Sequence, residues 1–147
     1  MVEIRPATLA DRSIIRAMVF AEHLDPTSLN WRNFLIAEQE GEIIGIGQIK
    51  TFPGCNELGS LVTRKSHRGQ GVARQLILAL EQKAGFPVYL LCESRLENFY
   101  AQFGFRTIGW RAAPMALKIK LLPTLLFRVF GIRILVMRKD RATDILV

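Results

Sequence analysis

The sequence predicts an α+β fold, in which one mixed β-sheet is flanked by helices within a single domain covering residues 1–147. The chain is long enough to bury one sizeable core. Half of its residues are hydrophobic and 22% are charged, which excludes disordered and low-complexity chains. Short apolar runs typical of strands alternate with apolar residues at helical spacing, so both element types are expected to share that core.

The first part of the chain predicts a strand, a helix and a β-hairpin. Residues 2–5 alternate between apolar and polar side chains, as a strand does. Thr8 and Asp11 have the spacing of a capping box, which indicates that a helix begins there. The apolar runs 34–38 and 43–49 are separated by a short polar stretch with one glycine, and this pattern is typical of a hairpin.

The second part predicts two helices between further strands. One helix begins near Val72 and stops before Gly85, and another begins at Ser94 and ends at Gly104. The strands are expected at residues 58–62, 88–92, 105–109 and 132–137. A basic, apolar insertion at about 112–131 precedes the last strand. Within it, residues 117–121 alternate like a strand, whereas 123–130 fit a short helix.

The positive charge of the chain is unevenly distributed. The net charge is +7, yet residues 1–60 carry five basic and eight acidic side chains. Residues 61–105 carry six basic and three acidic side chains, and residues 106–147 carry nine and two. This excess indicates an anionic partner, which leaves nucleic acid, an acidic membrane surface and a phosphorylated cofactor open.

Neither a metal site nor a membrane span is expected. Cys55 and Cys92 have no CxxC or histidine spacing, so a disulfide framework and a zinc site are both disfavoured. The N-terminus has no pattern of a secretory signal, and the most apolar stretch, 115–137, contains four basic residues and a proline. The expected location is the cytoplasm.

The most informative feature is the loop containing Gly69 and Gly71, between a predicted strand and a predicted helix. Free backbone N–H groups and the helix dipole favour phosphate oxygens at such a helix N-terminus. Basic side chains of the loop add hydrogen-bond donors: Arg64, Lys65, His67 and Arg68. A tight turn with an exposed basic rim is the alternative interpretation.

Two known phosphate loops fit less well. A Walker A loop requires lysine after its last glycine, whereas Val72 follows Gly71. A dinucleotide-binding fingerprint would have its third glycine where Arg74 stands, and it would occupy the first strand–helix unit of its fold. The dinucleotide interpretation is therefore a minor alternative.

Two segments match the signatures of a known family. The sequence Arg68-Gly69-Gln70-Gly71-Val72-Ala73 fits the acetyl-CoA signature Q/R-x-x-G-x-G/A. Tyr100 is followed after three residues by Gly104-Phe105, which fits the second signature. With the predicted order of elements, the chain resembles the GNAT superfamily of N-acetyltransferases over roughly three quarters of its length.

The resemblance implies a GNAT-like acyl-CoA N-acyltransferase fold with acetyl-CoA as co-substrate and no metal. In such a fold the strand before the loop and the strand after it splay apart, and the thioester lies between them. Glu93 stands where family members often have an asparagine that touches CoA, so that contact is uncertain. The implied pyrophosphate-binding backbone is that of Arg68, Gly69, Gln70, Gly71, Val72 and Ala73, and the implied pantetheine-lining residues are Leu61, Val62 and Thr63.

The implied reaction is direct attack of a primary amine, on a small molecule or peptide, in a ternary complex. Glu57 is the candidate general base through water, and a solvated charge at a strand end is its other interpretation. Tyr100 is the candidate proton donor to the departing thiolate, and an aromatic core residue is the other interpretation. A ping-pong route through Cys92 is a minor alternative, because a thiol on a buried strand is usually inert.

The charge pattern leaves the role of 112–131 open. The segment could form a lid over the acceptor site, contact a homodimer partner or, at 115–133, touch a membrane surface.

The identity of the acceptor is limited by charge, because a basic rim disfavours a polyamine. A non-catalytic acyl-CoA sensor, or a membrane-associated binding module on the same fold, is the alternative function. Nucleic acid binding is disfavoured because few aromatic residues lie among the basic ones.

Overall fold

A computed structural model describes residues 1–142, and residues 143–147 at the end of the predicted domain lie outside this range. The chain divides into two compact units. The first contains residues 1–50 and 58–84, and the second contains residues 51–57 and those from Gly85 onward. The single-domain organisation predicted from the sequence stays a prediction.

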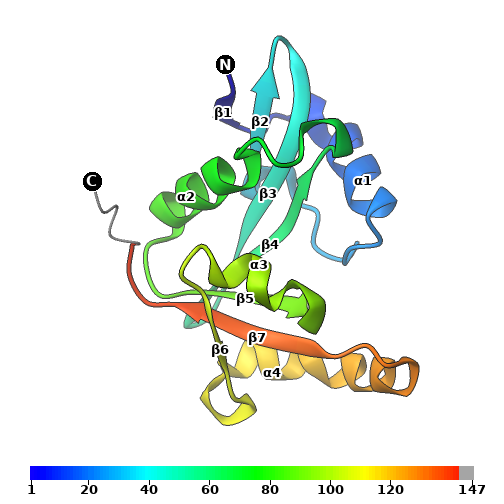
Figure 1. Ribbon diagram of the computed structural model, residues 1–147, viewed down its shortest axis with the longest axis vertical. Helices are drawn as coiled ribbons and strands as arrows, with labels where there is room; N and C mark the ends of the chain where they lie inside the picture. Colours follow the sequence, from blue (N-terminus) through cyan, green and yellow to red (C-terminus); the bar gives the residue numbers. More distant parts are fainter. Residues whose placement is uncertain (143–147) are drawn as a thin grey trace. The chain divides into compact units, whose positions relative to one another are not determined.

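The first unit contains four strands and two α-helices (Figure 1). Its strands follow the order β1-β2-β3-β4, and β1/β2 and β2/β3 are antiparallel pairs. The adjoining tips of β3 and β4, residues 51–57, belong to the second unit. The elements are β1 (Glu3–Pro6), α1 (Arg12–Ala21), β2 (Phe34–Gln39), β3 (Glu42–Phe52), β4 (Cys55–Thr63) and α2 (Val72–Ala84).

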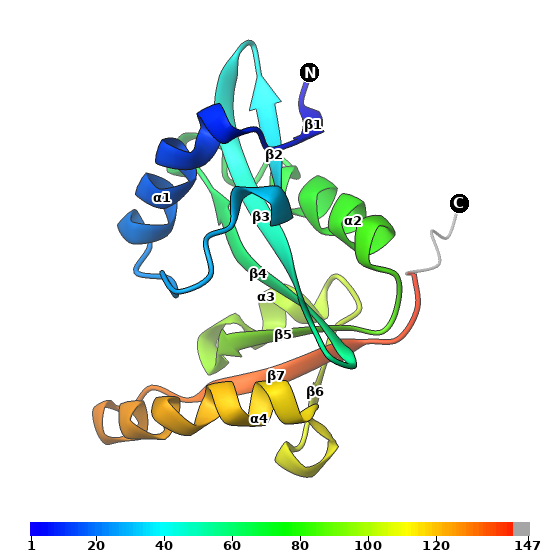
Figure 2. The same ribbon diagram turned by 180° about the vertical axis from the view of Figure 1, so that it is seen from behind.

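The two helices of the first unit pack on opposite faces of β3. Ile46 belongs to a buried cluster with Ile15 and Val19 of α1. Gly45 and Gly47 flank Ile46 in the strand and lie against side chains of α2. Because successive residues of a strand point to opposite faces, α1 and α2 cover the two sides of this sheet. Figure 2 shows the same strands from behind.

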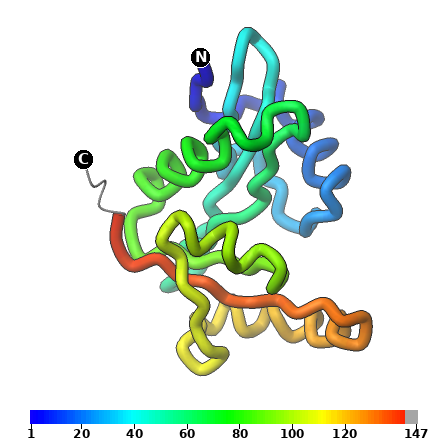
Figure 3. The backbone as a smooth tube through the Cα atoms, viewed as in Figure 1, coloured from blue at the N-terminus to red at the C-terminus, as the bar shows by residue number. Residues whose placement is uncertain are grey.

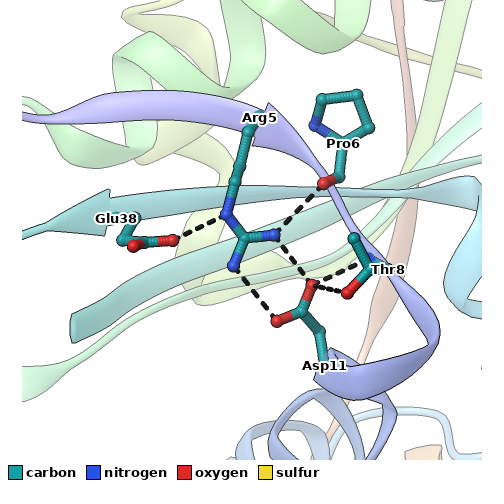
Figure 4. A network of polar contacts seen from close by, with 5 residues as sticks. All are labelled: Arg5, Pro6, Thr8, Asp11 and Glu38. Atoms are coloured by element: carbon teal, nitrogen blue, oxygen red, sulfur yellow. Dashed lines mark hydrogen bonds and ion pairs between the residues drawn. The ribbon is translucent and has the colours of Figure 1, made fainter. Parts of the chain in front are cut away.

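A polar network closes the corner between β1 and α1 (Figure 4). The guanidinium of Arg5 donates to both carboxylate oxygens of Asp11, at 2.8 and 3.1 Å, and to Glu38 at 2.6 Å. The backbone N–H of Thr8 donates to Asp11 at 2.7 Å, and the capping box predicted from these two residues is present. It lies on a short 3₁₀ turn, Leu9–Asp11, immediately before α1.

Besides the tips of β3 and β4, the described residues of the second unit form three strands in the order β5-β7-β6, with both pairs antiparallel. The helix predicted from Ser94 is shorter than expected, because it consists of one 3₁₀ turn (Ser94–Leu96) followed by α3. In Figure 3 the stretch after β6 runs side by side with β7. The elements are β5 (Val88–Glu93), α3 (Glu97–Ala101), β6 (Arg106–Ile108), α4 (Met115–Leu121), the 3₁₀ helix η6 (Leu122–Phe130) and β7 (Ile134–Lys139).

The strand-like alternation at 117–121 gave a wrong indication, since these residues form most of α4. Leu117 and Leu121 are four residues apart and therefore share one helical face, which is buried against Tyr89 and Val136. The helix predicted after Pro123 is present as η6, which ends at Gly131 in a left-handed conformation. The mixed α+β class predicted from the sequence is confirmed.

Residues 1–142 contain neither a candidate membrane-spanning helix nor a candidate metal-binding cluster. None of the helices formed by these residues has the length and apolar character needed to cross a bilayer. The same residues contain no group of three or more His, Cys, Asp or Glu side chains arranged to hold a metal ion.

Candidate functional site

The loop before α2 contains two glycines in the left-handed region of backbone conformation. Gly69 has φ +77° and Gly71 has φ +80°, where a residue with a Cβ would be strained. A Cβ placed on either glycine would meet nothing within 4 Å. The glycines are therefore required by the backbone path and not by crowding, and the space beside the loop is open.

This backbone path leaves N–H groups available at the start of α2. The hydrogen bond from Gln75 N–H to Gly71 O, at 3.1 Å, joins the loop to the first turn of the helix. Amides that precede this bond have no acceptor within the helix, and the dipole of the 13-residue helix adds partial positive charge there. The loop can therefore bind phosphate oxygens through its backbone.

Close packing on β3 fixes the position of α2. A Cβ on Gly45 would lie 2.9 Å from Val72 Cγ1 and 3.0 Å from Leu76 Cδ1. One on Gly47 would lie 2.9 Å from Leu80 Cδ1. An added Cβ would force these side chains of α2 to shift, so the two glycines allow α2 to pack closely on β3. Gly45 and Gly47 were not among the predicted site residues, although two glycines two residues apart within an apolar strand were a visible signal.

The basic side chains around the loop are partly engaged within the protein. Arg64 Nε donates to Ile43 O at 2.6 Å, so Arg64 anchors the loop to β3. Arg68 donates to Thr63 O at 3.2 Å and forms an ion pair with Glu22 at 3.0 Å. These contacts of Arg64 and Arg68 hold the loop in shape, and the role of the two side chains as additional donors to a ligand stays a prediction.

The end of β4 leads directly into the loop. Val62 is buried in the core, whereas Leu61 and Thr63 are half-buried, so Val62 can offer a ligand only its backbone. Ser60 has φ +51°, which interrupts the extended strand just before these three residues. Its hydroxyl accepts a hydrogen bond from buried Gln48 at 2.8 Å, and this bond holds the interruption in place.

Glu57, in the second unit, is a buried carboxylate. Only 3% of the residue is exposed, and Lys120 Nζ donates to its two carboxylate oxygens at 3.0 and 3.1 Å. The interpretation of Glu57 as a solvated strand-end charge is therefore wrong. Lys120 comes from α4, 63 residues along the chain, and it was missed because its segment had no settled secondary structure.

Tyr100 lies on α3 and is half-buried. Its ring packs edge to face against Phe99 and Phe105, with centroids 5.0 and 6.2 Å away. Loss of hydration raises the pKa of Tyr100 well above its ordinary value, and Cys92 adds a smaller contribution. The phenol therefore stays protonated throughout the neutral pH range, as a proton donor must. Within residues 1–142, no hydrogen bond joins Tyr100 to Glu57.

Both cysteines are buried free thiols. Burial raises the pKa of Cys55 and of Cys92 to about 11 in each case, and nearby carboxylates contribute less. A thiol with this pKa is almost entirely protonated at neutral pH and is a poor nucleophile. The ping-pong alternative through Cys92 is thus disfavoured. Glu93, at the end of β5, is paired with Arg95 at 2.6 Å.

Comparison with known proteins identifies the family. The sequence model described as the acetyltransferase (GNAT) domain matches residues 30–107, which is more than half of the chain. The chain therefore belongs to the GNAT acetyltransferase family. The match includes the loop, the end of β4, Glu57 and Tyr100. Among curated protein sequences, none matches this chain.

Solved structures share the fold at low sequence identity. N-acetylglutamate synthase from Neisseria gonorrhoeae, complexed with coenzyme A and N-acetyl-glutamate, has TM-score 0.79 and 21% identity, over 95% of this chain and 35% of that one. This chain thus spans about a third of that protein. Rv2747 from Mycobacterium tuberculosis, in complex with CoA, has TM-score 0.75 and 16% identity, over 95% and 99% of the two chains. Escherichia coli ElaA has TM-score 0.67 and 18% identity, over 95% and 100%.

Proposed function

We propose that the protein is an N-acetyltransferase that moves an acetyl group from acetyl-CoA to a primary amine by direct attack in a ternary complex. The observation that carries this proposal is the loop before α2. Gly69 and Gly71 hold it in a left-handed backbone conformation, with open space beside both residues, at a helix N-terminus. This fits a ligand that carries a pyrophosphate, and acetyl-CoA would supply the activated thioester.

The cofactor-binding residues proposed here act mainly through their backbone. Amides from Arg68 to Ala73 would hold the pyrophosphate, and the backbone of Leu61, Val62 and Thr63 would line the pantetheine chain. Support comes from the burial of the Val62 side chain and from the bond between Arg68 and Thr63 O, which ties the loop to the strand end. Side-chain substitutions in this segment should therefore matter less than changes of backbone conformation.

Two side chains of the second unit are proposed to move protons. Glu57, a buried carboxylate, would accept the proton of the attacking amine through a water molecule. Tyr100 would donate its phenolic proton to sulfur as the carbon–sulfur bond breaks. Lys120 would act on Glu57 as a positioning residue, because its ammonium holds both carboxylate oxygens.

The proposed acceptor is a primary amine on a small molecule or peptide that also carries a neutral or negative group. Support comes from charge, since residues 106–147 carry nine basic and two acidic side chains. Such a surface repels a polycation and attracts an anion. The N-acetyl-glutamate bound to the Neisseria gonorrhoeae enzyme is the acetylated form of an acceptor of this kind. Cytoplasmic location stays a prediction.

A calorimetric titration with acetyl-CoA, followed by rates for a panel of amines, tests the proposal. Tyr100→Phe is expected to lower the rate at saturating amine by about 100-fold while acetyl-CoA binding is retained. Phe99→Leu, which alters the neighbouring ring but no titrating group, is the matched control and should stay within about threefold of wild type. An unchanged rate in Tyr100→Phe, with chemistry limiting, would remove Tyr100 from its proposed role.

One observation favours a second candidate function, a non-catalytic acyl-CoA sensor. The carboxylate of Glu57 is already engaged by Lys120, and a base that stayed engaged could not accept a proton. The sensor predicts tight acetyl-CoA binding with no release of CoA in the presence of any amine. Turnover of a single amine at a rate that depends on Glu57 would exclude it.

A further inference from the structure

The stretch from α4 through η6 presents apolar side chains to solvent. Met115, Ile119 and Leu122 recur at helical spacing and share the face opposite to Leu117 and Leu121, which are buried. Further along, most of the apolar residues are exposed, with Val129 at 83%. We call the exposed set the apolar face, and it consists of Met115, Ile119, Leu122, Leu125, Leu126, Phe127, Val129, Phe130 and Ile132.

All the charged residues in the stretch that carries the apolar face are basic. From Asn98 to Lys139 the sequence contains eight Lys or Arg residues and no Asp or Glu. Arg128 and Arg133 are exposed and line an open hollow of about 410 Å³ with Gly131 and Ile132, at the end of η6. Two guanidinium groups border this hollow, and exposed Phe130 directly precedes Gly131 in the chain. This combination suits an anionic group attached to an apolar body.

The charge distribution discriminates between two ways to cover the apolar face. In a symmetric dimer the same patch faces itself, so basic residues would approach basic residues with no acid nearby in sequence to offset them. An anionic lipid surface instead provides hydrocarbon for the apolar side chains and phosphate for the guanidinium groups. Charge complementarity therefore favours the lipid surface over a second copy of the chain.

We propose that the apolar face, together with Arg128 and Arg133, docks on the surface of a bilayer rich in anionic phospholipid. The stretch would lie in the plane of the interface with its apolar side chains among the upper acyl chains. The guanidinium groups at the end of η6 would contact lipid phosphates. This inference does not depend on the proposed acetyl transfer, because the loop before α2 contributes nothing to it.

Cosedimentation of the full chain with vesicles tests the proposal. Vesicles of phosphatidylglycerol and phosphatidylcholine in equal amounts should retain the protein, and vesicles of phosphatidylcholine alone should not. Arg128→Gln with Arg133→Gln should weaken partitioning by about 30-fold, because each basic residue near the surface contributes roughly a factor of five. Val129→Ser with Phe130→Ser should weaken it by at least about tenfold through lost apolar burial.

Matched control variants lie on α1, in the first unit. Arg12→Gln with Arg16→Gln removes two exposed basic residues, and Phe20→Ser removes an aromatic side chain that is 55% exposed. Both controls should partition as wild type does. Circular dichroism and acetyl-CoA titration of every variant should match wild type, which separates loss of docking from loss of folding or of cofactor binding.

Three outcomes would overturn the proposal. In the first, the wild-type chain fails to sediment with the anionic vesicles. In the second, the α1 controls weaken partitioning as much as the η6 variants, so that only the overall charge matters. In the third, sedimentation equilibrium without lipid reveals a dimer that Val129→Ser with Phe130→Ser dissociates, which would assign the apolar face to a second copy of the chain.

Discussion

Asp11 in the first unit and Glu57 in the second are both buried carboxylates, with 6% and 3% of the residue exposed. Asp11 receives hydrogen bonds from Arg5 and from the backbone and hydroxyl of Thr8, all within six residues along the chain. The contacts of Glu57 differ, since the ammonium that holds it comes from Lys120, 63 residues away on a helix.

This difference distinguishes a structural carboxylate from one that is proposed to accept a proton. Hydrogen bonds from Arg5, followed by those from Thr8, lower the pKa of Asp11 to about 2. Removing any one donor leaves the others in place. A carboxylate held by one side chain loses its partner when that side chain moves, as the proposed role of Glu57 as a proton acceptor would require. Four variants test this contrast, from the largest expected effect to the smallest.

Glu57→Gln should lower the rate of acetyl transfer at saturating substrates by about 1000-fold, because a neutral amide cannot accept the proton of the amine. Binding of acetyl-CoA should change by less than about twofold, since the proposed contacts are made by the backbone of the loop. Steady-state rates and calorimetry measure the two effects. Asp11→Asn is the paired control, and an equal fall in its rate per folded molecule would contradict the contrast.

Lys120→Met should destabilise the protein by about 3 kcal/mol, because it leaves a buried carboxylate without its counter-charge. Urea unfolding measures the loss. Lys118→Met on the same helix removes an ammonium that donates to the carbonyl of Arg111, and it should cost less than about 1 kcal/mol. When Glu57 is already replaced by Gln, Lys120→Met should lower the free energy of unfolding by less than it does in wild type. If the losses of the two single variants simply add in the double variant, the two residues are not coupled.

Asp11→Asn should destabilise the protein by about 2 kcal/mol at pH 7, because the folded pKa lies below its usual value. The contribution of Asp11 is fully present above its unfolded pKa of 3.8 and is lost as pH falls towards about 2. The stabilities of wild type and variant should therefore converge over that window. Asp140→Asn, an exposed ion-pair control, should change stability by less than about 0.5 kcal/mol.

Thr8→Ala should cost about 1 kcal/mol, the usual value of a capping side chain. The backbone N–H of residue 8 still donates to Asp11 in this variant, so most of the network persists. Thermal unfolding at pH 7 measures the change. A loss as large as that of Asp11→Asn would show that the network fails as one unit and lacks the redundancy described above.

The parts of the structure that depend on near neighbours in sequence could be predicted. Thr8 and Asp11 form their capping box within a single turn, and Gly69 and Gly71 supply a backbone conformation that few other residues adopt. Strands in apolar runs such as β5 depend only on local composition. For these residues the local free energy and the final fold favour the same conformation.

The parts that depend on distant partners could not be predicted. The alternation at 117–121 fits a strand, but Leu117 and Leu121 also fit one helical face, and burial against the second unit's core favours the helix. The ion pair of Lys120 with Glu57 could be predicted only once residues 117–121 were known to form a helix. Gly45 likewise becomes informative only once α2 is known to lie on its face of β3.

Because both thiols are buried, they should not interfere with the detection of coenzyme A released in the proposed acetyl transfer. At pH 8 a thiol with pKa about 11 is ionised in roughly one molecule in a thousand, and both Cys55 and Cys92 are shielded from bulky reagents as well. A chromogenic disulfide reagent added during the acetyl-transfer assay should therefore react with free coenzyme A and leave the protein unlabelled. Each acetyl group transferred would then release one equivalent of coenzyme A thiol, which the absorbance measures without a contribution from the thiols of Cys55 and Cys92.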